Sequence, residues 1–251
     1  DMERPIVFVA FTGEEAGRRG SRWFVQNERR YPVSKITAMI NLDTVGRMEK
    51  DRLIVLGTAT AKEWSPVFRE LAKPLKIEIV ETTQDLDASD QKSFHEAGVP
   101  AVQLFTGGHL DYHRPTDRAD KINGKGLAKI ATLVRDVVYT LANQPAPLTP
   151  TVAPAPGAAP ARGDRKVTIG IVPDFTYTGT GVRLAGTVPG GPAENGGMKE
   201  GDVVILVGTA KVTVLQDLSD AIKRSQPGEK VPVRFLRGGQ EMKTTVEVKE
   251  R

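Results

Sequence analysis

Hydrophobic and polar positions in the first part of the chain alternate between strand-like and helix-like patterns. Short apolar runs, typical of strands buried on both faces, stand at 6–11, 36–42, 53–56, 77–80 and 100–105. Helical stretches lie among them at 21–29, 64–71, 92–97 and 126–141. This alternation predicts an α/β fold in which helices flank a mostly parallel sheet.

The last part of the chain has a different pattern. Short β-branched runs separated by Gly, Pro and Asp turns stand at 167–172, 182–188, 203–207, 231–236 and 244–248. A single helical stretch, 215–224, lies among them. The pattern predicts a small β-rich domain with one main helix.

A segment rich in Pro and Ala separates these two parts. Residues 143–164 show no hydrophobic periodicity, which is typical of a semi-extended linker. We therefore expect a first domain at 1–144, a linker at 145–163 and a second domain at 164–251.

Composition narrows the possible functions only a little. The 251 residues suit two domains, and a net charge of +4 is a mild excess for that length. The densest basic patch comprises Arg18, Arg19, Arg22, Arg29 and Arg30. We predict that it is a solvated helix face, and we expect no nucleic-acid partner. The absence of cysteine excludes disulfides, thiolate metal sites and a Cys nucleophile. No apolar run is long enough to predict a membrane span.

Acidic and histidine residues follow three of the predicted strands. Glu14 and Glu15 come after 6–11, Asp43 ends 36–42, and His113 lies in the loop after 100–105. In open α/β sheets, active groups gather beyond the carboxyl ends of the strands. Zinc accepts carboxylates together with imidazole, and a neighbouring glutamate can take a proton from water. Taken singly, each residue also fits a plainer role, as an acid at a helix start, a turn residue or an exposed loop histidine.

Three segments of the first domain carry a family resemblance. They are "VFVAFTGEEAGRRGSRWFV", "AMINLDTVGRM" and "SDQKSFHEAGVPAVQLFTGGHLDYHRPTDRADKIN". In this order they resemble the later two thirds of the di-zinc aminopeptidases, a family that includes secreted bacterial leucyl aminopeptidases and relatives of glutamate carboxypeptidase II and the transferrin receptor. The resemblance implies an α/β zinc-exopeptidase fold.

The same resemblance assigns roles to individual residues. Glu14 matches the general base, Glu15 and His113 match two ligands of one zinc, and Asp43 matches a ligand of the other. His109 and Tyr112 are expected to line the pocket. The family takes five ligands, of which a histidine and a bridging aspartate come from segments upstream of the strand expected at 6–11. We therefore expect a piece of a larger hydrolase that is inactive alone and exposes a sheet edge.

The second domain resembles a bacterial PDZ domain of the kind attached to exported proteases. The motifs are "VTIGIVPDF" and, most specifically, "GGPAENGGMKEGDVV". The resemblance implies that a peptide adds as a strand beside 167–172, with its carboxylate on backbone N–H groups between Thr168 and Ile171. Gly170 would let the backbone bend there. Side chains that could form either an apolar pocket or part of the core are Ile169, Ile171, Leu218 and Ile222.

Together these features predict a metallo-aminopeptidase that carries a PDZ domain. By resemblance it would use two zinc ions, act on peptide substrates and work in the periplasm or outside a bacterial cell. One alternative is a non-enzymatic peptide-binding scaffold with a degenerate peptidase fold. Another keeps the fold but performs glutaminyl cyclisation or carboxypeptidase chemistry.

Overall fold

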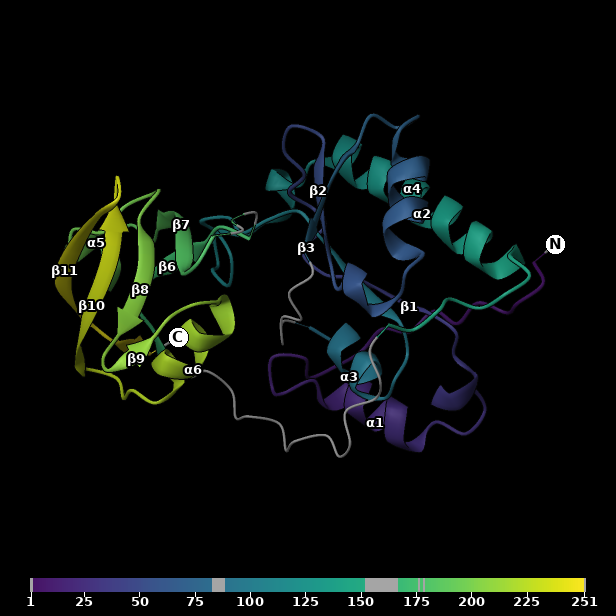
Figure 1. Cartoon of the computed structure of the whole chain (residues 1–251), viewed down its shortest axis with the longest axis horizontal. Helices are drawn as coiled ribbons and strands as arrows, with labels where there is room; N and C mark the ends of the chain where they lie inside the picture. The colour runs from purple at the N-terminus through teal and green to yellow at the C-terminus, as the bar shows by residue number, and fades with distance from the viewer. Residues whose placement is uncertain (1, 83–88, 152–166, 176, 178, 251) are drawn as a thin grey trace. The chain divides into compact units, whose positions relative to one another are not determined.

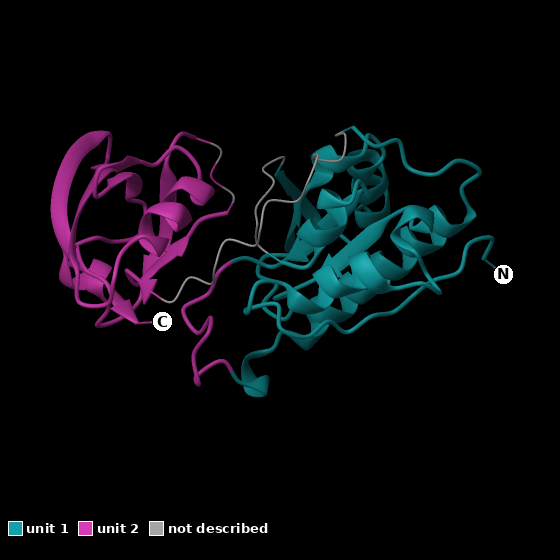
Figure 2. Cartoon of the chain, turned by 90° about the horizontal axis from the view of Figure 1, so that it is seen from below, with its two compact units in different colours: residues 1–107, 118–163 teal, residues 108–117, 164–251 magenta. Residues whose placement is uncertain are grey.

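The computed structural model describes residues 2–82, 89–151, 167–175, 177 and 179–250. These form two compact units (Figure 2), which are described separately. The first unit comprises residues 1–107 and 118–163, and the second comprises 108–117 and 164–251.

The first unit is built around a four-stranded sheet with the order β1-β4-β2-β3. Its strands are β1 (Met39–Leu42), β2 (Arg52–Leu56), β3 (Glu78–Thr82) and β4 (Ala101–Phe105). The pairs β1–β4 and β2–β3 are parallel, and β2–β4 is antiparallel. The predicted α/β class with a mostly parallel sheet is therefore confirmed.

Four helices flank this sheet in two pairs: α1 (Arg19–Asn27), α2 (Trp64–Ala72), α3 (Gln91–Glu96) and α4 (Gly124–Asn143). Helix α2 packs with α4, and α1 packs with α3 (Figure 1). Short 3₁₀ turns at Val33–Lys35, Thr58–Thr60 and Ala119–Lys121 connect the elements. The predicted helices are present, with ends displaced by a few residues.

The alternation of side chains along β4 shows how the two helix pairs cover the sheet. Val102 and Leu104 belong to the core cluster that contains Trp64 and Leu133, whereas Ala101 belongs to the cluster with Phe94. Because neighbouring strand residues point to opposite faces, the pair α2–α4 covers one face and α1–α3 the other. Phe94 completes a ring cluster with Phe11 and Phe24, at centroid distances of 5.8 to 5.9 Å.

The strand predicted at 6–11 is absent, and that prediction was wrong. Phe8 is 92% exposed, and residues 6, 7 and 9 are also largely exposed. No backbone hydrogen bond between described residues involves 6–11. An apolar run becomes a strand only when a neighbouring strand accepts its ladder of hydrogen bonds, and only Phe11 of this run packs against a core cluster.

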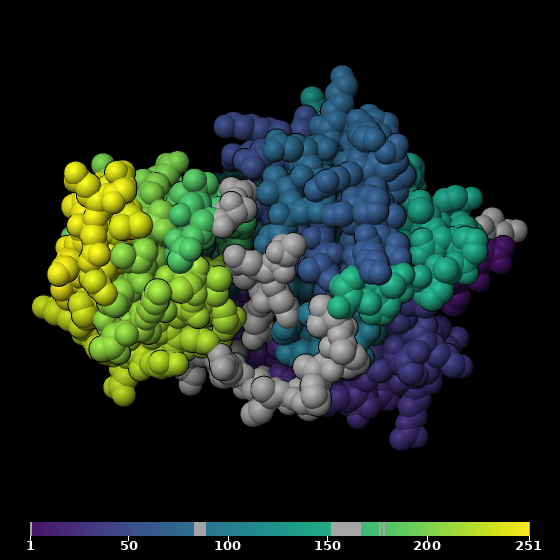
Figure 3. Space-filling model, in the orientation of Figure 1, coloured from purple at the N-terminus to yellow at the C-terminus, as the bar shows by residue number. Residues whose placement is uncertain are grey.

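The second unit contains a sheet with the order β11-β10-β8-β7-β6. Its strands are β6 (Ile171–Pro173), β7 (Val182–Thr187), β8 (Val203–Val207), β10 (Lys230–Arg237) and β11 (Gln240–Glu247). Further short strands, β9 (Ala210–Lys211), β5 (Val167–Thr168) and β12 (Lys249–Glu250), pair with β8 and with each other. Most of β11 is exposed on the surface (yellow in Figure 3).

Two helices complete the second unit: α5 (Pro192–Asn195) and α6 (Leu215–Lys223). The predicted main helix is α6, whose buried residues are Leu218, Ala221 and Ile222. The predicted strand at 167–172 is divided into β5 and β6, because Gly170 between them has a left-handed φ of 73°. The β-rich class of this domain is otherwise as predicted.

Part of the segment assigned to the linker packs on the first unit. Leu148 is 4% exposed and belongs to the same core cluster as Trp64. Thr149 donates its N–H to Glu63 at 2.9 Å. The rest of the predicted linker, 152–163, lies outside the described residues. Over the described part of the chain, every helix is too short or too polar to cross a membrane.

Candidate functional site

Glu14 and Glu15 lie in a tight turn between residue 11 and helix α1. The N–H groups of Gly17 and Arg18 both donate to the Glu14 carbonyl oxygen, at 3.0 and 2.7 Å. Gly20 donates to the Thr12 oxygen at 2.9 Å, and a Cβ at Gly20 would stand 2.6 Å from that same oxygen. The turn therefore requires glycine at this position, which accounts for part of the spacing in "GEEAGRRG".

Asp43 follows β1 and is held by its neighbours. Its Oδ1 accepts a hydrogen bond from the Thr44 hydroxyl at 3.1 Å, and its Oδ2 accepts one from Gln103 Nε2 at 3.4 Å. Thr44 adopts a φ of 55°, which is rare for a β-branched residue. Residues in such strained conformations persist where the surrounding structure fixes them, and they cluster at functional sites.

The carboxylates of this region lie close enough together to act on the pKa of Glu14. The pKa of Glu14 is raised to about 7, first by burial and then by the negative charges of Glu15, Asp43 and Asp90, while Arg18 opposes the shift. Burial also raises the pKa of Asp90, with a further contribution from Asp43. The structure thus brings the two predicted glutamates and Asp43 into one electrostatic cluster.

The chemistry of this cluster fits a divalent cation. Like charges in a partly buried site repel one another, and a bound cation removes that repulsion. The Oδ1 atom of Asp90, in a side chain that is only 7% exposed, has no hydrogen-bond partner among the described residues. Within the described ranges, however, no group of three or more His, Asp or Glu side chains could hold a metal ion. The carboxylates are donors of the right type for such a cation, but the residues that the structure describes do not supply a complete set of ligands.

The histidines predicted for the site lie in residues 108–117, which belong to the second unit. The rings of Tyr112 and His113 are stacked at 3.8 Å, and His109 meets Tyr112 edge-on at 6.2 Å. His109 Nε2 stands 3.8 Å from Asp117 Oδ2. His113 has a left-handed φ of 57°. These three residues form one group within the second unit.

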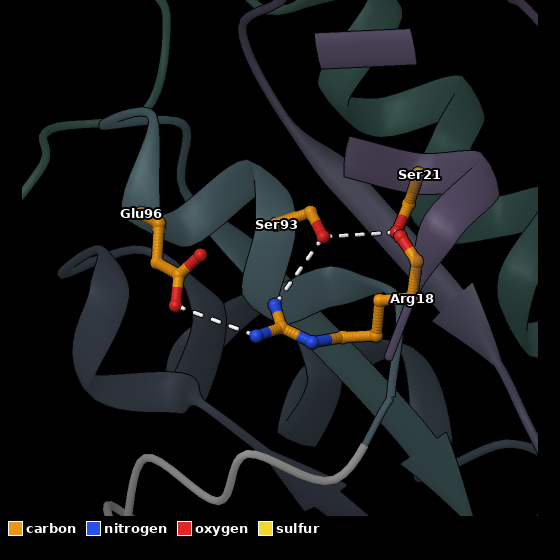
Figure 4. A network of polar contacts seen from close by, with 4 residues as sticks. All are labelled: Arg18, Ser21, Ser93 and Glu96. Atoms are coloured by element: carbon orange, nitrogen blue, oxygen red, sulfur yellow. Dashed lines mark hydrogen bonds and ion pairs between the residues drawn. The ribbon is translucent and has the colours of Figure 1, made fainter. Parts of the chain in front are cut away.

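Two polar contacts near the carboxylates were not expected from the sequence. Asn41 Nδ2 donates to Ser89 Oγ at 2.9 Å and to Gln91 Oε1 at 3.1 Å. Arg18, predicted to lie on a solvated helix face, is only 6% exposed and bonds to α3 (Figure 4). That prediction was wrong for Arg18, because hydroxyl and carboxylate partners on α3 compensate the burial of its charge. The sequence pattern contains no signal for either contact, since the partners are far apart along the chain.

The peptide-binding segment predicted in the second unit lies around Gly170. Its N–H bonds to the Thr168 hydroxyl at 3.0 Å, and a Cβ there would stand 2.9 Å from Pro192. Strand β6 pairs with β7 and stands at the end of the strand order. The four predicted pocket residues divide by burial: Ile171 is half-buried, while the core contains Ile169, Leu218 and Ile222.

Comparisons with known proteins match the two parts of the chain to different families, and the first match includes residues 108–117, which group with the second unit in the structure. The model of peptidase family M28 matches residues 1–138, and the PDZ domain model matches 167–248. Aminopeptidase YwaD of Bacillus subtilis is 28% identical over 147 residues, which is 55% of this chain and 32% of that protein. Serine protease HTRA1 of Xenopus tropicalis is 37% identical over 79 residues, 32% of this chain and 17% of that protein.

Among solved structures, the LapA aminopeptidase of Legionella pneumophila resembles this chain in fold. Its TM-score is 0.51 at 21% identity, over 57% of this chain and 41% of that chain. The chain spans at most about a third of the length of the curated relatives described above.

Proposed function

Because the chain belongs to peptidase family M28, we propose that its first unit is part of a zinc-dependent aminopeptidase that removes N-terminal residues from peptides. The observation that carries the proposal is the electrostatic cluster of Glu14, Glu15 and Asp43, of which Asp43 directly follows β1. The similarity to an aminopeptidase of Bacillus subtilis over 147 residues supports the same reaction.

The proposal gives each predicted site residue a separate role. By the roles that the family resemblance assigns, Glu15, His113 and Asp43 would each be a ligand of zinc. Bound zinc would polarise the scissile carbonyl and supply the positive charge that the carboxylates lack. Glu14 would accept a proton from the attacking water at its carboxylate. His109 and Tyr112 would line the pocket that receives the substrate.

We further propose that the second unit binds an extended peptide at strand β6. Strand addition needs an edge with unpaired backbone groups, and β6 ends the strand order of its sheet. The N–H groups between Thr168 and Ile171, around Gly170, would receive the peptide carboxylate. Ile171 would line the pocket, with its floor formed by Ile169, Leu218 and Ile222. A periplasmic or extracellular location would suit both peptide-directed roles.

The chain alone supplies few ligands for this chemistry. The assignment gives three protein ligands for two zinc ions, whereas one catalytic zinc usually takes three. We therefore expect the 251-residue chain to bind zinc weakly and to be inactive alone. Chelator-sensitive hydrolysis of an aminoacyl chromogenic amide by this chain would contradict that part of the proposal.

Metal titration tests the site directly. Cobalt(II) absorbs visible light when bound to protein ligands and is a probe for the zinc site. We expect Glu15→Gln and Asp43→Asn each to weaken cobalt binding by about tenfold or more, because each removes an assigned ligand. Glu70→Gln, which removes an exposed carboxylate from α2, is the matched control and should bind cobalt as the unmodified chain does.

The titration also separates the enzyme from its alternative. If Glu15→Gln and Asp43→Asn bind cobalt as well as Glu70→Gln does, the metal assignment is wrong. A chain that binds no cobalt but binds peptides through its second unit would instead be the non-enzymatic scaffold. Calorimetric titration with peptides that end in a free carboxylate, compared with their amidated forms, measures that second activity.

A further inference from the structure

Arg18 combines two unfavourable features at one position. Its backbone has a left-handed conformation, with φ 57° and ψ 39°, just before helix α1. Its side chain is buried, at 8% exposure. Left-handed backbone is disfavoured for a residue with a Cβ, and a buried charge is disfavoured unless it is paired. Contacts that hold Arg18 in place must offset both.

Helix α3 provides these contacts (Figure 4). Arg18 Nη1 donates to Ser93 Oγ at 3.2 Å, and Nη2 lies 3.5 Å from Glu96 Oε1. The Ser93 hydroxyl is also hydrogen-bonded to the Ser21 hydroxyl at 2.9 Å. Ser21 and Ser93 are both almost fully buried. The guanidinium and two hydroxyls thus join the start of α1 to α3 in a site sheltered from water.

The same residue is bonded to the turn that carries the predicted catalytic glutamates. The Arg18 N–H donates to the Glu14 carbonyl oxygen at 2.7 Å. On the other side of the network, Gln91 at the start of α3 accepts a hydrogen bond from Asn41, two residues before Asp43. A displacement of Arg18 would therefore disturb both the turn that carries Glu14 and the segment that carries Asp43.

The charge of Arg18 acts in the same place. Its positive charge interacts favourably with the negative charges of Glu14 and Asp90. Arg18 therefore both fixes the turn and partly neutralises the cluster.

We infer that Arg18 is a positioning residue that holds the Glu14–Glu15 turn against α3 in the geometry needed to bind the metal. The inference rests on the proposed function in assigning a metal to this cluster. Arg18 need not contact substrate or metal, because it acts through the turn and through α3.

The test compares Arg18→Met with Arg29→Met in the full chain. Both variants lose one positive charge, but Arg29 is exposed. Hydrogen exchange measures the mobility of residues 12–20, and cobalt absorption measures metal affinity. We expect Arg18→Met to speed exchange in 12–20 and to weaken cobalt binding about tenfold. Arg29→Met should match the unmodified chain in both, and Arg18→Lys should recover part of the cobalt affinity by restoring the charge.

Ser93→Ala keeps the test decisive if Arg18→Met does not fold. It removes only the hydroxyl shared by Arg18 and Ser21, and it should produce a smaller change in the same direction. Arg18 is not a positioning residue if Arg18→Met shows the same hydrogen exchange and the same cobalt affinity as Arg29→Met. When Arg18→Met does not fold, the same comparison is made with Ser93→Ala. If the unmodified chain binds no cobalt, the proposed function fails, and exchange in 12–20 alone decides whether Arg18 holds the turn.

Discussion

In the turn at 12–20, contacts of the backbone, rather than side-chain chemistry, limit which residue can stand at a given position. Gly20 lies inside the first turn of α1 with its α-carbon against the backbone of Thr12. Gly17 and Arg18 donate to a single carbonyl oxygen. The backbone of the turn that carries Glu14 and Glu15 is thus held by hydrogen bonds of the main chain, with Glu14 half-buried and Glu15 exposed.

Gly20→Ala should disturb this turn. The added methyl group would stand 2.6 Å from the Thr12 oxygen, so the backbone must shift, and we expect a loss of roughly 1–3 kcal/mol in unfolding free energy. Gly124→Ala is the control, since a Cβ at Gly124 meets nothing within 4 Å. Urea denaturation followed by circular dichroism measures both. Equal stability of the two variants would show that the turn tolerates the methyl group.

Glu14 should be needed for turnover but not as a ligand. Because the 251-residue chain is expected to be inactive alone, this test needs a zinc-loaded form of the enzyme that hydrolyses an aminoacyl chromogenic amide. In that form, Glu14→Gln should lower kcat by about 10²- to 10⁴-fold, because the carboxylate assigned to accept the proton from water is removed. Its zinc content, measured by atomic absorption, should stay close to that of the unmodified protein. Glu70→Gln again serves as the control. A Glu14→Gln variant with unchanged kcat would remove Glu14 from the mechanism.

At the scale of elements, helix α6 depends on an acid in its first turn. Asp217 Oδ2 accepts hydrogen bonds from the N–H groups of Thr213 and Val214, at 2.9 and 3.1 Å. These bonds lower the pKa of Asp217, with the side-chain bond from Thr213 contributing most. Asp217→Ala should cost about 1 kcal/mol of stability at neutral pH.

The same contact predicts a pH dependence. Because the folded-state pKa is depressed, the stabilisation is complete above the unfolded pKa of about 4 and is lost as pH falls through the lower folded value. The difference in urea midpoint between the unmodified chain and Asp217→Ala should therefore shrink between pH 7 and pH 3. Glu200→Ala, which replaces an exposed acid in a turn, should show no such dependence. A constant difference for Asp217→Ala would contradict the role of the ionised carboxylate.

The elements that the sequence predicts correctly are those whose partners follow from hydrophobic periodicity alone. The helix at 126–141 and the strand at 100–105 have strongly apolar faces, and both occur with small changes at their ends. The run at 6–11 is equally apolar, yet it forms no strand, because pairing depends on a partner that periodicity does not reveal. Gly170 divides another predicted strand, since only the three-dimensional turn requires a positive φ there.

The candidate site follows the same division. The ends of predicted strands indicated Glu14, Glu15 and Asp43, which form one electrostatic cluster in the structure, although the strand expected before the two glutamates is absent. Arg18 was misjudged because a cluster of arginines usually marks a solvated face, whereas its partners Ser93 and Glu96 lie on α3, more than 70 positions away. A contact between segments so distant in sequence leaves no local pattern from which it could be predicted.

The whole molecule is best understood as two units with separate cores. The first buries Leu133 against β2 and β4, and the second has its own cluster around Phe235 and Ile222. In the second unit, Asp202 is 1% exposed and accepts two hydrogen bonds from the Arg237 guanidinium, both at 2.8 Å. It also accepts the Lys199 N–H at 2.8 Å. Each unit therefore has stabilising contacts that can be removed without touching the other core.

Scanning calorimetry of the full chain should accordingly resolve two transitions. Leu133→Ala leaves a cavity in the first core and should cost about 2–5 kcal/mol there. Asp202→Ala removes the ion pair between Asp202 and Arg237. Because Arg237 is partly exposed, the loss should be about 2–3 kcal/mol in the unfolding free energy of the second unit. At about 2–8 °C per kcal/mol for domains of this size, each variant should lower one midpoint by several degrees and leave the other in place. If either variant lowers both midpoints equally, the two units unfold as one and the division into independent cores is wrong.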